Sequence, residues 1–257
     1  MPVVHLICSD VPSSGKSFIA WQLAMHMMYN SQPLKIFDLD PEKVISSFNG
    51  FTTFHFNVVD FDYSELFKKV LSSKTDILID STYKQFDTLM NYLEADNSKL
   101  LSLFSESNLK LVLHLPVCGG ATKEQCIKTV NSVLERFTST NVVAWLNHYP
   151  VSVINEVKPT NDVFYNLFSD QGTLRFVVNL PRFCDSKTVT DDTCNYFLNS
   201  LWKERKIYGQ LLDTEHFAEA CNPYLDNRPF VMIMAQRVGY IRDVFDEAIA
   251  PLSEIIF

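Results

Sequence analysis

The sequence predicts an α/β protein built on a doubly wound, mostly parallel sheet of about six to eight strands. Short apolar runs rich in β-branched residues alternate with longer segments of helical periodicity. The short runs are apolar throughout, which is typical of strands buried on both faces of a parallel sheet. The predicted strands are Val3–Cys8, Leu34–Phe37, Ile77–Ile79, Leu111–Leu115, Val142–Leu146 and Phe176–Leu180, with an edge strand at Thr53–Val58.

Helical periodicity fills the intervals between these strands. Amphipathic stripes predict helices over Ser17–Tyr29, Tyr63–Leu71 and Lys123–Phe137. After Pro181 the strand pattern stops, and Asp191–Leu212 and Phe230–Ala250 have the pattern of two long helices. We therefore expect a single domain over residues 1–257, in which an α/β core (1–184) carries a helical extension (185–257) packed on it.

Composition narrows the function classes. The chain has 257 residues, a net charge of −8 and a pI near 5.2, so direct DNA binding, which needs a basic face, is not expected. It shows no secretory signal pattern and no apolar stretch long enough to span a membrane. Its 6 cysteines include no C-x-x-C pair, so we expect reduced thiols in a cytoplasmic protein.

The first predicted strand leads into the residues Cys8-Ser9-Asp10-Val11-Pro12-Ser13-Ser14-Gly15-Lys16-Ser17. Strand, loop, Gly-Lys-Ser and helix follow one another in the order of a P-loop, which holds nucleotide phosphates at a helix N-terminus. In that arrangement Lys16 would reach the β- and γ-phosphates, and the Ser17 hydroxyl would ligate Mg²⁺. The alternative is a chance tripeptide that caps a helix after a turn.

Acidic residues follow two further strands. Asp38 and Asp40 come directly after the second strand, where a carboxylate can position water or hold the Mg²⁺ shell. Asp80 ends an apolar run, which is the Walker B arrangement with a carboxylate near Mg²⁺. Asp and Pro in a turn, or Asp80 as a helix cap, are the alternative interpretations. The carboxyl ends of parallel strands share one sheet edge, so we expect these groups to converge with Lys16.

Two later strand ends are also candidates. Asn147 ends the strand Val142–Leu146, and an amide there can pair with a purine edge through its donor and its acceptor. A turn asparagine is the alternative. Gly119 and Gly120 follow the strand Leu111–Leu115 and suggest close backbone approach to a ligand or a neighbouring subunit.

Taken in order, these motifs resemble the TraL-type proteins of conjugative plasmids, within the ParA/MinD/CobQ class of deviant P-loop ATPases. The resemblance covers most of the chain and is weakest between Pro181 and Pro229. The matching segments are Gly15–Ser17, Asp38–Pro41, Asp76–Ser81, Val117–Gly120, Val143–Tyr149 and Ile233–Val238.

The resemblance implies a cytoplasmic ATPase that binds ATP with Mg²⁺ and serves plasmid transfer or maintenance. It also implies a homodimer or a partner protein of such a system. Catalytic roles are expected for Lys16, Asp38 and Asp40, and metal binding for Ser17 and Asp80. Nucleotide contacts are expected from Ser13, Ser14, Gly15, Lys16, Ser17, Phe18 and Asn147.

The P-loop departs from the class pattern K-G-G-x-G-K-[ST] at its start. Val11 stands where the class has its signature lysine, and Pro12 and Ser13 stand where it has glycines. Pro12 removes one N–H donor from the phosphate cradle. Asp10 is expected to place a negative charge close to the phosphates. Nucleotide affinity is therefore expected to be weaker than in an intact P-loop.

Three functions fit these observations. The first is a weak ATPase that acts as a molecular switch. The second is an interaction module that kept the fold but lost turnover. The third is an ATP-dependent small-molecule synthetase of the dethiobiotin synthase kind, whose P-loop can also carry an aspartate near this position. ATP hydrolysis separates the first two, and ADP formation that depends on a co-substrate would indicate the third.

Overall fold

A seven-stranded parallel sheet forms the centre of the protein in a computed structural model. The structure describes residues 1–40, 52–56, 63–95, 97–148, 153, 166–168, 172–180, 243 and 245–253. The strand order is β3-β2-β4-β1-β5-β6-β7. The strands are β1 (Val3–Ile7), β2 (Leu34–Asp38), β3 (Thr52–His55), β4 (Asp76–Asp80), β5 (Lys110–Cys118), β6 (Asn141–Asn147) and β7 (Leu174–Leu180).

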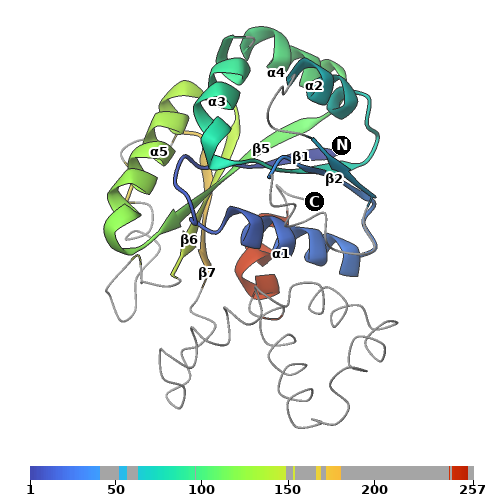
Figure 1. Cartoon of the computed structure of the whole chain (residues 1–257). Coiled ribbons are helices and arrows are strands. Elements are labelled where there is room, and N and C mark those ends of the chain that lie inside the picture. The colour runs from blue at the N-terminus through green and yellow to red at the C-terminus, as the bar shows by residue number, and fades with distance from the viewer. Residues whose placement is uncertain are drawn as a thin grey trace, which may run out of the picture.

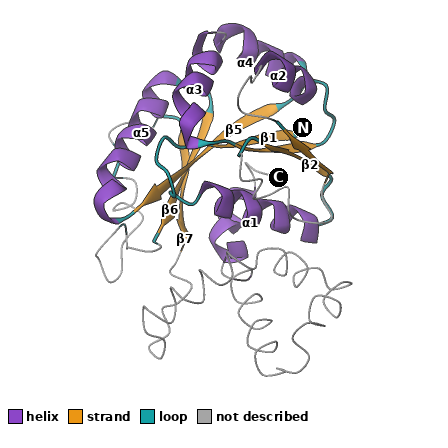
Figure 2. Ribbon diagram, viewed as in Figure 1, coloured by secondary structure: helices purple, strands orange, loops and turns teal. Residues whose placement is uncertain are grey.

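Helices cover both faces of this sheet. Four of them lie on one face, and α1 lies on the other beside the short helical segment near the C-terminus (Figure 1; Figure 2). The helices are α1 (Lys16–Tyr29), α2 (Tyr63–Leu71), α3 (Phe86–Ala95), α4 (Asn97–Glu106) and α5 (Lys123–Arg136), with the 3-10 turns η3 (Tyr83–Gln85), η4 (Gly120–Thr122) and η6 (Ala250–Leu252).

The predicted fold class is confirmed: the sheet is parallel, has seven strands and is doubly wound. The sequence interpretation assigned no helix between the third and fourth main strands, where the structure has α3 and α4. Their length does not explain this, since the predicted helix α2 has 9 residues and each of these has 10. The helical signal in α3 was missed: its buried residues Phe86, Leu89, Met90 and Leu93 recur at helical spacing. The predicted helix Asp191–Leu212 and most of Phe230–Ala250 lie outside the described residues.

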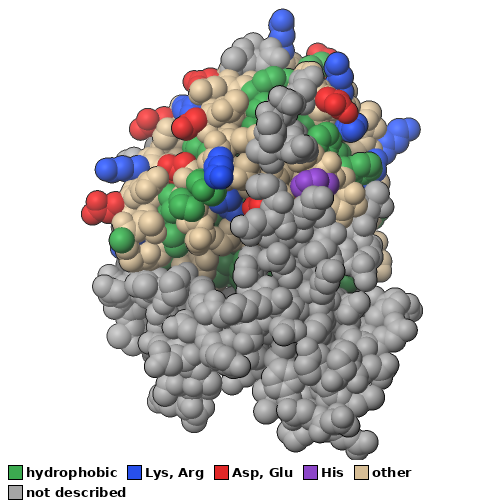
Figure 3. Space-filling view, viewed as in Figure 1, with side chains coloured by type: hydrophobic (Ala, Val, Ile, Leu, Met, Phe, Trp, Pro, Cys, Tyr) green, Lys and Arg blue, Asp and Glu red, His purple; other side chains and the backbone are tan. Residues whose placement is uncertain are grey.

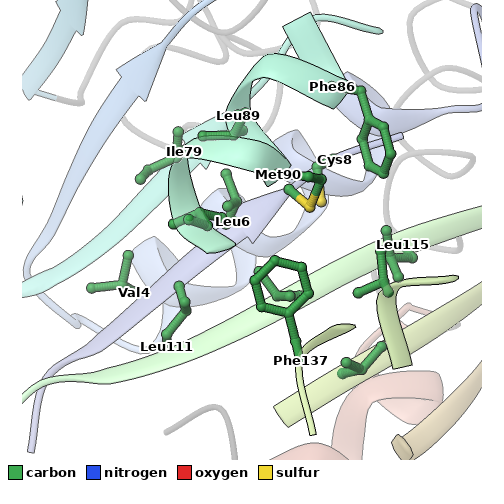
Figure 4. Packing of buried hydrophobic residues seen from close by; sticks show 14 of the residues in the cluster. Val4, Leu6, Cys8, Ile79, Phe86, Leu89, Met90, Leu111, Leu115 and Phe137 are labelled. Atoms are coloured by element: carbon green, nitrogen blue, oxygen red, sulfur yellow. The ribbon is translucent and has the colours of Figure 1, made fainter. Parts of the chain in front are cut away.

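The larger hydrophobic core lies between the sheet and helices α2 to α5. Figure 4 shows side chains of β1, α3 and β5 meeting there. Alternate residues of β1 point to this face, because successive side chains of a strand point to opposite sides. The labelled members are Val4, Leu6, Cys8, Ile79, Phe86, Leu89, Met90, Leu111, Leu115 and Phe137.

A second core lies under α1. Ile19 and Leu23 of α1 pack there with Trp145 of β6, and all three side chains are fully buried. The ring of Phe245 stacks on Trp145 with centroids 5.7 Å apart. Residues 245–252 thus belong to the layer that covers the α1 face of the sheet, whereas most of the predicted extension 185–257 lies outside the described residues.

A buried hydrogen-bonded row crosses three strands in this second core. Trp145 Nε1 donates to His114 Nδ1 over 3.0 Å, and His114 Nε2 lies 3.1 Å from His5 Nδ1. Indole is a donor only, so neutral His114 must carry its proton on Nε2 and donate it to His5. Burial lowers the pKa of both imidazoles, that of His5 to about 3, with Lys110 adding a smaller effect for His5. Both rings are therefore neutral at pH 7.

The strand order indicates where a ligand would bind at the edge of the sheet. From β1 the chain moves outward to β2 on one side, and after β4 it crosses β1 to build β5, β6 and β7 on the other. In open parallel sheets, ligands bind beyond the carboxyl ends of the strands at the point where the order reverses. In this sheet that point is the end of β1, between β4 and β5.

We predict that Trp145→Phe lowers the free energy of unfolding by about 1–3 kcal/mol, because it leaves the buried His114 acceptor without its donor. Urea denaturation at pH 7 measures this. The conservative ring keeps most of the stacking on Phe245, so a loss of stability below about 0.5 kcal/mol would mean that the row of hydrogen bonds contributes nothing.

Candidate functional site

The loop between β1 and α1 has the backbone conformation that a P-loop needs at Gly15. Gly15 has φ 95°, a left-handed conformation that favours glycine, and its carbonyl accepts the first hydrogen bond of α1 from Ile19 over 3.0 Å. A Cβ added at this position would overlap the side-chain amide of Asn147. The glycine is therefore required by both its φ angle and its neighbour.

Asn147, at the end of β6, is the neighbour that holds this loop. Its Nδ2 donates to the Ser14 carbonyl over 3.2 Å, and its side chain is 7% exposed. The sequence suggested that this amide reads a purine edge. In the structure one of its donors is already directed at the P-loop backbone, so any base contact would be made by the remaining donor or the oxygen.

Lys16 begins α1 and is almost fully buried. Its ammonium group donates to the Val11 carbonyl over 3.2 Å and lies 5.7 Å from the centre of the Tyr83 ring. Burial lowers its pKa, and the nearby Asp80 carboxylate is the largest influence in the opposite direction. Lys16 is thus held inside the loop, between a backbone carbonyl and the face of an aromatic ring.

Asp38 and Asp80 lie side by side at the ends of β2 and β4. They are paired in the register of these strands, and both side chains are fully buried. The backbone N–H of Asp40 donates to Asp38 Oδ1 over 3.0 Å. All three carboxylates act electrostatically on one another or on Lys16, so the structure gathers the acidic residues of two strand ends at the P-loop.

Asp80 has the most strongly perturbed carboxyl group of the three. Its pKa is raised to about 8, chiefly by burial; Asp38 and Asp40 contribute to the increase, and the Ser17 hydroxyl and Lys16 oppose it. Ser17 is close enough to lower this pKa, but neither oxygen of Asp80 has a fully formed hydrogen bond among the described residues. A buried carboxylate without partners is costly unless a cation or proton compensates for it.

The remaining predicted contact residues are divided between the loop and the core. Ser13 is exposed and has φ 56°, at a position where the class pattern has glycine. Ser14 is fully buried, and its hydroxyl has no hydrogen bond among the described residues. Phe18 packs in the core under α1, with its ring 6.2 Å from that of Trp21. The Phe18 side chain is partly buried, and a nucleotide contact from this residue stays a prediction.

The start of the loop differs from what the sequence suggested for Asp10. Its Oδ1 accepts from Thr129 Oγ1 over 2.6 Å and its Oδ2 from Gln125 Nε2 over 3.1 Å. The carboxylate is thus tied to α5 rather than left free to repel a phosphate, although its charge still raises the pKa of Lys16. Sequence reasoning missed this contact because its partners are more than a hundred residues away in the chain.

Tyr83 is a second residue that sequence reasoning missed. It lies in η3 after β4, is 40% exposed, and presents its ring to Lys16. The only signal in the sequence is its position three residues beyond Asp80. An exposed aromatic ring beside a P-loop lysine is one of the few exposed large hydrophobic side chains in the described part of the chain.

These residues fit a phosphate group with Mg²⁺. The chain supplies one carboxylate with two unpartnered oxygens, one hydroxyl and one ammonium group at a helix N-terminus. Within the described ranges, no group of three or more His, Cys, Asp or Glu side chains is arranged to hold a metal ion. At Mg²⁺ sites the protein commonly gives one or two ligands, and substrate phosphates and water give the rest.

Comparisons with known proteins identify no family for the chain. No protein-family model matches it, and no curated protein matches it. A solved structure is similar: a proposed plasmid partition protein from Borrelia burgdorferi B31, bound to AMPPNP. The two chains are 12% identical, the match covers 88% of this chain and 100% of the other, and the TM-score is 0.44. The P-loop fold of this chain is therefore argued from its own strand order and loop geometry.

We predict that Gly15→Ala lowers the free energy of unfolding by about 1–3 kcal/mol, because the new Cβ meets Asn147 and the φ angle disfavours any side chain. Chemical denaturation of the two proteins measures the loss. Adding Asn147→Ala should recover part of it by removing the overlap while the φ penalty stays. A double variant no more stable than Gly15→Ala would contradict the steric explanation.

Asp80 predicts a pH dependence of stability. Its folded pKa is about 8 and its unfolded pKa is the ordinary value of 3.8, so the folded protein binds more protons between these limits. Stability therefore falls as pH rises through this window and levels off above about pH 8. Relative to Asp80→Asn, the melting temperature of the unchanged protein should drop between pH 6.5 and 8.5, because the variant shares the opposite contribution of His5 and His114, which titrate near pH 6.5 in the unfolded chain. In Asp80→Asn the drop should shrink; an equal drop would assign it to another group.

Proposed function

We propose that this chain binds ATP with Mg²⁺ at its P-loop and hydrolyses it slowly, as a molecular switch of the ParA/MinD kind. The observation that carries the proposal is the Asp80 carboxyl group, which is fully buried beside Ser17 and Lys16 with neither oxygen in a well-formed hydrogen bond among the described residues. Such a carboxylate needs a cation, and a helix N-terminus with a lysine needs an anion. A nucleotide phosphate with its Mg²⁺ satisfies both.

Each residue of the site has a distinct role in this proposal. Gly15 lets the phosphates approach the backbone at the start of α1, and Lys16 leaves the Val11 carbonyl to contact them. Ser17 and Asp80 hold Mg²⁺, directly or through water. Asp38 and Asp40 orient the water around it. Bound Mg²⁺ would supply positive charge to the phosphate oxygens as negative charge develops on them.

We propose slow turnover because the signature lysine of the ParA/MinD class is replaced in this chain. Val11 occupies the signature-lysine position, and its side chain is fully buried in the larger core. A residue at this position cannot extend across a dimer interface to the nucleotide of a second subunit. Any hydrolysis would therefore rely on Lys16, Asp38 and Asp40 of the same chain.

The biological setting is proposed from the resemblance to TraL-type proteins: a cytoplasmic switch in plasmid transfer or maintenance that acts as a homodimer or with a partner protein. Direct DNA contact is not part of the proposal. Figure 3 shows acidic and basic side chains interspersed over the described surface in view, with no continuous basic patch there. In the part of the chain that the structure describes, no helix has the length and apolar character to cross a bilayer.

We predict that Lys16→Ala weakens ATP binding at least about tenfold, because it removes the one ammonium group at the phosphate cradle. Isothermal titration with ATP, ADP and GTP, each with and without Mg²⁺, measures the affinities. Lys84→Ala is the matched control, since Lys84 is exposed and its ammonium group lies 5.9 Å from the centre of the same Tyr83 ring. This control should bind as the unchanged protein does.

A companion variant tests the metal role of Asp80. Asp80→Asn should weaken binding in Mg²⁺ more than binding in EDTA, because its effect acts through the metal shell. Failure of the unchanged protein to bind any of the three nucleotides would reject the proposal in favour of an interaction module. Binding without measurable ADP formation would reject only the switch, and ADP formation that needs a small-molecule co-substrate would indicate a synthetase.

A further inference from the structure

Two buried thiols meet beside the P-loop. Cys118 is the last residue of β5 and Cys126 lies in α5, and their sulfur atoms are 3.5 Å apart. A disulfide bond needs about 2.05 Å, so the sulfurs must approach by only about 1.5 Å to bond. Gly119 and Gly120 connect the two elements, and Gly120 has φ 75°. The contact is set by the fold and not by the short spacing alone, because the chain reverses direction between strand and helix.

The surroundings make the two thiols unequal. The Thr122 hydroxyl lies 3.1 Å from the Cys118 sulfur, and the Cys126 thiol is the second donor to it. Hydrogen bonds from Cys126 and Thr122 hold the pKa of Cys118 below its ordinary value. Donating to Cys118, together with burial, raises the pKa of Cys126. Cys118 therefore carries the thiolate, and Cys126 keeps its proton.

We propose that Cys118 and Cys126 are an oxidisable dithiol, a modification site that reacts with hydrogen peroxide to form an intrachain disulfide. The Cys118 thiolate attacks one peroxide oxygen, the O–O bond breaks, and Cys118 becomes a sulfenic acid while hydroxide leaves. The Cys126 sulfur then attacks the sulfenic sulfur, the S–S bond forms and the S–O bond breaks. The proton of Cys126 and the proton that Cys118 released on ionisation combine with the two hydroxides, which leave as water. In total, two thiols and one peroxide give one disulfide and two waters.

The disulfide would act on the P-loop through α5. Gln125 and Thr129, one residue before and three after Cys126, are the two residues that bind the Asp10 carboxylate. Drawing Cys126 toward Cys118 shifts this part of α5 and with it the anchor of the loop. This consequence rests on the proposed nucleotide function, and oxidation is expected to weaken ATP affinity by about threefold or more. Formation of the disulfide itself does not rest on that function.

Peptide mapping of the full chain tests the modification. The reduced protein is exposed to hydrogen peroxide, its remaining thiols are alkylated, and it is digested with trypsin, which separates the two cysteines at Lys123. The expected product is a pair of peptides joined through Cys118 and Cys126, released by dithiothreitol. Cys126→Ser should give instead a sulfenic acid at Cys118 that dimedone traps. Cys221→Ser, the matched control, should form the same disulfide. If both thiols stay open to alkylation, the site is rejected.

The hydroxyl of Thr122 gives an independent test. Thr122→Val should slow alkylation of Cys118 by iodoacetamide at pH 7 by about threefold or more, because the sulfur loses a donor that stabilises its thiolate. Thr122→Ser, which keeps the hydroxyl, should react at the rate of the unchanged protein. Equal rates in all three proteins would contradict the assignment of Cys118 as the nucleophile.

Titration with ATP and Mg²⁺ tests the link to the loop. Peroxide should weaken binding in the unchanged protein and have no effect on Cys118→Ser. A mapped disulfide with unchanged affinity would overturn the link through α5. Absence of binding in both the oxidised and the reduced protein would overturn the link and the proposed function together, whereas peptide mapping decides the modification site on its own.

Discussion

The position of the P-loop depends on the contact between Gly15 and Asn147. Asn147 donates to the Ser14 carbonyl, and its amide occupies the space that a side chain at residue 15 would need. This contact ties the loop after the central strand to the end of β6, across β5. On the other side of the loop, Asp10 is bound by α5. The loop is therefore fixed from two directions before any ligand binds, which lowers the entropy that a ligand must remove.

The charged side chains beside the P-loop determine which kind of ligand can bind there. The carboxyl groups of Asp38, Asp40 and Asp80 lie at the same edge of the sheet as the buried Lys16, so acidic groups outnumber basic ones among the described residues of this site. A free anion would be repelled by these carboxylates, whereas an anion that arrives with a divalent cation would be accepted. Burial of Asp80 strengthens this selection, because the same low polarity that raises its pKa makes an uncompensated charge there expensive.

Local patterns in the sequence predicted most of the fold. All seven described strands were predicted within a few residues of their bounds, since all but the edge strand β3 are mainly apolar runs. The helix Tyr63–Leu71 was predicted with the bounds that the structure has. The meeting of Asp38, Asp80 and Lys16 could also be expected, because parallel strands end at one edge. Contacts that depend on tertiary placement could not. Thr129 reaches Asp10 only because α5 packs beside β5, and the local sequence around Thr129 or Asp10 does not predict this hydrogen bond.

The role expected for Phe18 shows a related limit. Its position after Ser17 placed it in the P-loop motif; in α1 its partly buried side chain packs against the core under the helix, near Trp21, and a nucleotide contact from it stays a prediction. A motif gives the order of residues along the backbone, and the rotation of the helix decides which side chains face the ligand.

The central position of β1 in the sheet also affects how the protein folds during its synthesis. Val4 is paired in register with Ile77 of β4 and Leu111 of β5, so β1 has neighbours that are synthesised after it. Until β5 emerges, the apolar residues of β1 and α1 have no completed sheet to pack on. Nascent chains with such long-range parallel pairing fold slowly and expose aggregation-prone surface in the meantime. Translation of this protein is therefore a period in which chaperones have an accessible N-terminal substrate.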